Sequence, residues 1–146
     1  MNIRKYLPVI AIAVLGCLII SVASAVYYSI TVKSHGKIKG VGVGIYADEN
    51  ATIVVSEINW GMLEPGESKN VTVYVKNEGN VQVTLALTVE SWVPSNAEDF
   101  ITLSWNYDGT TFDVEEIRRL TLTLTVDSSI TGITEFSFDI VISAEG

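Results

Sequence analysis

The chain has 146 residues, of which 48% are hydrophobic, and its formal net charge is -8 at pH 7. An acidic chain of this kind argues against a nucleic-acid-binding protein, because phosphate backbones are bound by clustered Lys and Arg side chains. The single cysteine and single histidine also leave too few ligands for an ordinary transition-metal site.

The first predicted element is a long apolar block, residues 6–28, which follows Arg4 and Lys5. A basic start before an apolar run is typical of a secretory signal peptide or of a membrane anchor. In both cases the basic residues stay inside and the rest of the chain is sent outside. We therefore expect an extracellular or cell-surface protein.

Small residues close this block and indicate where it could be cut. Ala23 and Ala25 fit an Ala-x-Ala cleavage site, so residues 1–25 would be the signal peptide and Val26 the new N-terminus. The block exceeds the roughly 7 to 15 apolar residues of a usual signal peptide, and about 20 can span a bilayer. A retained transmembrane helix is the alternative. A lipoprotein-like cleavage before Cys17 is less favoured, since the apolar run continues beyond it.

The next predicted element is an amphipathic strand with a hinge, residues 26–36. Its apolar face consists of Val26, Tyr28, Ile30 and Val32, and Ser34-His35-Gly36 is interpreted as the hinge. Once freed by cleavage, such a strand could complete the sheet of a neighbouring subunit, and a repeated head-to-tail contact would yield a filament. The alternatives are an ordinary first strand of the chain's own domain, or a stalk that continues from an anchor.

Residues 37–146 are predicted to form one all-β domain, because apolar and polar residues alternate with the period of a strand. Two such faces packed together favour an immunoglobulin-like β-sandwich of seven or eight antiparallel strands over a closed barrel or a jelly roll. The expected strands are 38–47, 52–58, 68–76, 81–90, 101–106, 120–127 and 136–143.

Glycines recur in the first of these strands and in front of it, at Gly36, Gly40, Gly42 and Gly44. A phosphate-binding loop would need a following helix and usually a Lys-Ser/Thr pair, which are missing here. A strand with one nearly bare face is the preferred interpretation. That face could admit another backbone or a large ring at close range.

Few residues suggest chemistry, and we predict neither an enzyme nor a cofactor. His35 has no Gly-x-Ser-x-Gly partner motif for a serine triad. Trp60, Trp92 and Trp105 are interpreted as core residues, with a sugar-binding platform as the alternative. Asn96, Glu98 and Asp99 could hold calcium only weakly, because the spacing of a calcium loop is missing. The sequons at Asn50 and Asn70 are candidate N-glycosylation sites.

Several segments carry a resemblance to known exported proteins. They are Val41-Gly-Val-Gly-Ile-Tyr46, Ile58-Asn-Trp-Gly-Met-Leu-Glu-Pro-Gly-Glu-Ser68, Val75-Lys-Asn-Glu-Gly-Asn80, Trp92-Val-Pro94 and Phe136-Ser-Phe-Asp-Ile140. Together they resemble archaeal bundling-pilus subunits and, more distantly, the TasA/camelysin group of biofilm matrix fibre proteins. Subunits of those families assemble by donor-strand exchange, which would map here onto residues 26–33. The metallopeptidase activity attached to the camelysin name has no His-Glu-x-x-His motif here.

These observations lead to one expected function and one alternative. We expect a structural cell-surface protein, a pilus or biofilm-fibre subunit that associates with itself by donor-strand complementation. The alternative is a membrane-anchored extracellular domain that binds a partner protein or a glycan. In either case the chain would meet the membrane through its N-terminal segment.

Overall fold

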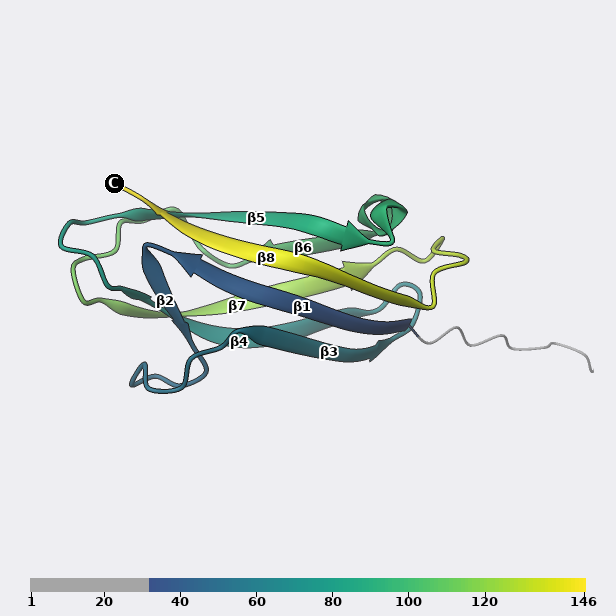
Figure 1. Ribbon diagram of the computed structural model, residues 1–146, viewed down its shortest axis with the longest axis horizontal. Coiled ribbons are helices and arrows are strands. Elements are labelled where there is room, and N and C mark those ends of the chain that lie inside the picture. Colours follow the sequence, from purple (N-terminus) through teal and green to yellow (C-terminus); the bar gives the residue numbers. More distant parts are fainter. Residues whose placement is uncertain (1–31) are drawn as a thin grey trace, which may run out of the picture.

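A computed structural model describes residues 32–146 of the chain. These residues form eight strands and one short 3-10 helix (Figure 1). In chain order the elements are β1 (Val32–Val41), β2 (Val43–Tyr46), β3 (Glu57–Leu63), β4 (Ser68–Asn77), β5 (Thr84–Val93), η2 (Ser95–Asp99), β6 (Ile101–Trp105), β7 (Ile117–Val126) and β8 (Glu135–Glu145).

The strands form two four-stranded sheets that pack face to face, which confirms the predicted β-sandwich. Sheet A has the strand order β3-β1-β8-β5, and sheet B has the order β2-β4-β7-β6. Neighbouring strands run antiparallel except for β1 and β8, which are parallel. The prediction of antiparallel strands throughout is therefore wrong for this one pair.

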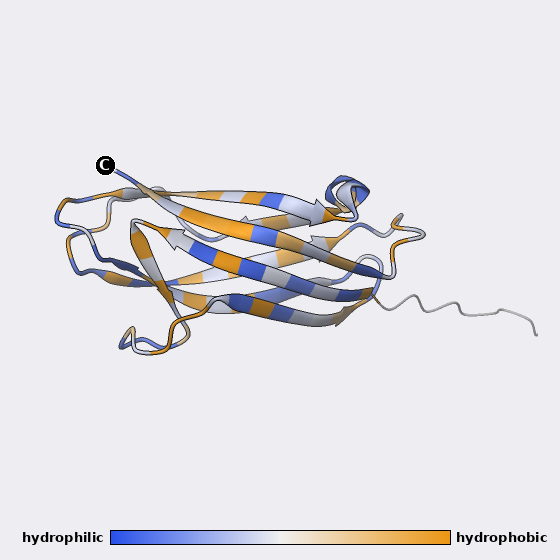
Figure 2. Cartoon of the chain, viewed as in Figure 1, coloured by the Kyte–Doolittle hydropathy of each residue, from blue (hydrophilic) through white to orange (hydrophobic). Residues whose placement is uncertain are grey.

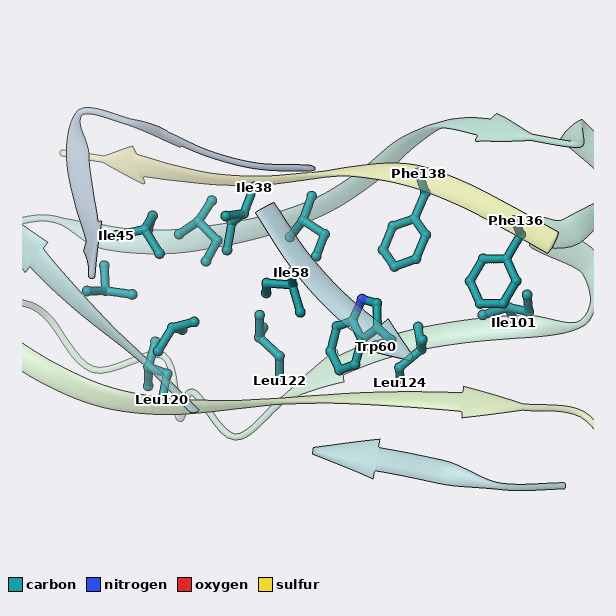
Figure 3. Close-up of a cluster of buried hydrophobic side chains, with 14 of the residues drawn as sticks. Ile38, Ile45, Ile58, Trp60, Ile101, Leu120, Leu122, Leu124, Phe136 and Phe138 are labelled. Carbon is teal, nitrogen blue, oxygen red and sulfur yellow. The ribbon is translucent and has the colours of Figure 1, made fainter. Parts of the chain in front are cut away.

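The core lies between the sheets and is built by strict alternation along the strands. On β7, buried Leu122 and Leu124 alternate with threonines that face outward, and on β8 buried Phe136 and Phe138 alternate with Ser137. Figure 3 shows the side chains of these two strands meeting in the interior, and Figure 2 shows the alternation as hydrophobic and hydrophilic residues along the strands. Burial of these apolar side chains supplies the main stabilising free energy.

Three predicted strands differ from those observed. The predicted strand 38–47 is two strands in different sheets, because Gly42 adopts a φ of 78° and turns the chain. Most of the predicted strand 52–58 is a loop, since the Asp48 carboxylate accepts hydrogen bonds from the backbone N–H groups of Thr52 and Ile53 at 2.9 and 2.7 Å. The predicted strand 81–90 begins later, at Thr84.

Candidate functional site: the β1 slot

Strand β1 lies inside sheet A, with a strand paired to each of its edges (Figure 1). It runs antiparallel to β3 from Val32 opposite Leu63, and parallel to β8 from Lys33 opposite Glu135. We call the space between β3 and β8 the β1 slot. The first strand of the described chain is thus a central strand, and β3 is joined to the rest of sheet A only through it.

The inward face of β1 fills the slot with apolar and small residues. Val32 and Ile38 are 0% and 5% exposed, and between them lie Ser34 and Gly36, which are also buried. The Ser34 hydroxyl donates a hydrogen bond to the carbonyl of Gly61 at 3.3 Å. The hinge predicted at 34–36 is therefore wrong, because these residues continue the strand alternation and are paired with both neighbouring strands.

Gly36 leaves room for the large ring of Trp60 where β1 crosses it. A Cβ atom at Gly36 would lie 3.2 Å from Trp60 Nε1 and 3.2 Å from Ile140 Cδ1. Trp60 is 3% exposed, and its indole N–H has no hydrogen-bond partner among the described residues. The expectation that the glycine face admits a large ring is confirmed at Gly36, and Figure 3 shows Trp60 within the core.

The other two tryptophans also pack on the core rather than standing free. Trp92 is half-buried and stacks on Phe138, with ring centroids 4.5 Å apart. Trp105 is half-buried beside Tyr107, at a centroid distance of 5.2 Å. Core packing is thus the role that the described contacts give to all three tryptophans.

The connection from β1 to β2 is a single residue that changes sheets. Gly42 adopts a left-handed backbone conformation, with φ of 78°, which other residues adopt only at a cost. Two residues earlier, a Cβ atom at Gly40 would lie 2.1 Å from the carbonyl oxygen of Val43. This closed turn therefore requires glycine at Gly40 and favours glycine at Gly42.

The two sequon asparagines are exposed, and their glycosylation stays a prediction. Asn50 lies in the loop between β2 and β3. Asn70 lies on β4, where its Oδ1 accepts a hydrogen bond from the Thr123 hydroxyl at 2.8 Å. In the Asn50 loop, desolvation raises the pKa of Asp48, but the hydrogen bonds it accepts from Ile53 and Thr52 outweigh this, so the pKa lies below its usual value.

The candidate calcium ligands and His35 do not lie together in one site. Asn96, Glu98 and Asp99 belong to η2, and His35 faces outward on β1, in sheet A. Within residues 32–146 there is no group of three or more His, Cys, Asp or Glu side chains that could hold a metal ion.

The predicted N-terminal features mostly fall outside the described residues. Val26, Tyr28 and Ile30 of the candidate donor strand and Ala23 and Ala25 of the candidate cleavage site all precede residue 32. In the part of the chain that the structure describes, no helix is long and apolar enough to cross a membrane. Neither the models of known protein families nor the curated proteins give a match to the chain.

We expect Gly36→Val to disturb the packing of β1 in the β1 slot and to destabilise the domain. The added side chain would push against Trp60 and Ile140, and overpacking of this kind costs about 1–3 kcal/mol of unfolding free energy. His35→Val, on the outward face of the same strand, is the matched control and should change stability by less than about 0.5 kcal/mol. Urea unfolding measures both variants. Equal stabilities would contradict the packing described for Gly36.

Proposed function

We propose that the chain is a non-enzymatic structural subunit of an extracellular filament, with an immunoglobulin-like sandwich and a β1 strand that fills the β1 slot of the next subunit. The observation that carries the proposal is the central place of β1 in sheet A. Without this strand, β3 has no partner in sheet A among the described strands, and the buried positions of Val32 and Ile38 stand empty. The slot must therefore be filled, either by the same chain or by a neighbouring one.

Exchange between subunits would preserve nearly every contact that β1 makes. The same backbone hydrogen bonds and the same core contacts form whether the strand comes from its own chain or from an identical neighbour. Only the connection around Gly42 has to change, from a tight turn to an extended link. A strand passed head to tail does not close on itself, and so it builds a filament.

The proposed donor element is longer than the segment predicted from sequence. Of the four predicted donor residues only Val32 is described, and it is the first residue of β1. Strand pairing then continues to Val41. The exchanged unit in this proposal is therefore the whole of β1, and its pivot is at Gly42 instead of at 34–36.

A second function is favoured by one specific observation, namely that a single chain fills its own slot. If residues 1–25 are retained as an anchor, the same domain is complete as a monomer on the membrane surface. It would then present its outer faces to a partner protein or a glycan. The two functions differ in whether β1 pairs within one chain or between chains.

A cysteine pair across the slot distinguishes the two functions. His35 and Asn59 are cross-strand neighbours on β1 and β3, and Cβ atoms of such pairs lie within reach of a disulfide. In the exported protein carrying H35C and N59C, exchange should produce a ladder of covalent oligomers on non-reducing gels. The control pair T102C and T125C joins β6 to β7, which are not exchanged, and should give monomers. Monomers from both pairs would contradict the filament and support the anchored domain.

Replacing the pivot glycine should favour exchange. Gly42→Ala strains the closed turn, because a left-handed conformation costs a non-glycine residue roughly 1–2 kcal/mol, whereas an extended link costs nothing extra. We expect the exchanged fraction to rise about 5- to 30-fold, as measured by size-exclusion chromatography with light scattering.

Gly109→Ala is the matched control for this change. Gly109 has a φ of 82°, and a Cβ atom added there would meet no other atom within 4 Å, so the strain is similar but lies away from β1. This variant should lose stability without gaining oligomers. An equal rise in both variants would show that general destabilisation, not the pivot, drives association.

A further inference from the structure

The outer face of β1 is basic, in contrast to the rest of the domain. Lys33, Lys37 and Lys39 point outward on this strand, with His35 among them, and β1 contains no acid. The described residues hold only seven Lys and Arg in all, against seventeen Asp and Glu. Three of the seven basic residues thus belong to the one strand that the proposed function makes mobile.

The walls of the slot are acidic at the matching positions. In the parallel register Glu135 of β8 lies opposite Lys33, and Asp139 of β8 lies opposite Lys37. On the other side, Glu57 of β3 also lies opposite Lys37. Strands β3, β5 and β8 contain no Lys or Arg. All the lysines of sheet A are therefore on β1, and all its acids are on the other three strands.

These charges act through solvent rather than as tight ion pairs. Within residues 32–146, the contacts below about 4 Å between opposite charges involve only Lys76 and Arg118. The lysines of β1 are exposed, so their attraction to the slot is a field effect that salt weakens. Two subunits with a strong negative net charge repel each other overall, and β1 is where opposite charges would meet.

The charges on β1, β3 and β8 bear on the register of β1, that is, on which residues of β1 lie opposite which residues of its two neighbours. Backbone hydrogen bonds do not depend on side chains, and a slip of two residues keeps the inward and outward faces of a strand unchanged. That slip would move Lys37 from Asp139 to Ser137 or Val141, and would bring Ser34 or Ile38 onto the ring of Trp60. The bare Gly36 position therefore rejects the slip in both directions. Charge opposes mainly the slip that brings His35 opposite Asp139, because the other slip places Lys39 opposite Asp139 and Glu57 and loses only the pairing of Lys33 with Glu135.

We infer that the lysines of β1 and the acids of β3 and β8 form a charge code that makes the slot selective for β1 of a second copy of this chain. This inference rests on the proposed function. It names the specificity determinants of the exchange as Lys33 and Lys37 on the donated strand, and as Glu57, Glu135 and Asp139 on the accepting subunit.

The test mixes two full-length exported chains, each with one half of the cysteine pair. The donor chain carries H35C and the acceptor chain carries N59C, so that a covalent heterodimer forms only when β1 of the donor enters the slot of the acceptor. Each chain is made with native charges or with mirrored charges, K33E/K37E on the donor and E57K/E135K/D139K on the acceptor. The yield of heterodimer is measured on non-reducing gels for all four combinations.

We expect the two mixed combinations to yield on the order of tenfold less heterodimer than the native pair, since cross-strand attraction becomes repulsion. The mirrored pair should recover at least the native yield, and the differences should shrink in about 1 M salt. Lys39 lies opposite Val141, so K39E on the donor makes one of the same Lys-to-Glu charge reversals without reversing a cross-strand pair and should leave the yield within about twofold of native.

The outcomes of this test separate the charge code from strand exchange itself. Four equal combinations, all above the level of a T102C donor mixed with a T125C acceptor, would overturn the charge code and leave strand exchange standing. No heterodimer above that level, even for the native pair, would overturn the proposed function itself. A single chain with all five mirrored charges should fold and cross-link with its own kind as the native chain does, and failure of this chain would also overturn the code.

Discussion

The pairing of β1 on both of its edges is the constraint on which the rest of the sandwich depends. Strands β3 and β8 do not contact each other as neighbours in sheet A, and only β1 joins them. Its inward residues also close the core over Trp60, whose ring occupies the room left by Gly36. The strand is therefore not an accessory at the edge of a finished domain but the element that makes sheet A continuous.

Strand β1 also has features that would allow it to leave the slot of its own chain. It is joined to β2 by a one-residue turn in which glycine alone relieves the strain at Gly42 and the clash at Gly40. Its basic outer face differs from the acidic strands around it, so in the proposed exchange the slot would recognise it by charge as well as by shape. Exchange would break and re-form many hydrogen bonds at once, so we expect it to be slow and to depend on how easily the turn opens.

Alternation along the chain predicts the layers well and the first strand poorly. Strands β4, β7 and β8 lie close to their expected bounds, because each buries every second residue against one core. Ser34 and Gly36 suggest a hinge, yet Gly36 is the position at which Trp60 arrives from a different strand. The parallel β1–β8 pair and the acids opposite Lys33 and Lys37 depend on topology, which local pattern does not contain. Sequence thus predicts an N-terminal donor strand, but neither the length of β1 nor its place in sheet A.

The most direct test of strand exchange is a cryo-EM reconstruction of fibres formed by the native exported protein, at a resolution that traces the backbone. The account predicts continuous density from β2 of one subunit through Gly42 into a β1 strand seated between β3 and β8 of the next subunit. Density that returns β1 to the slot of its own chain would contradict it, as would an exported protein that forms no fibres.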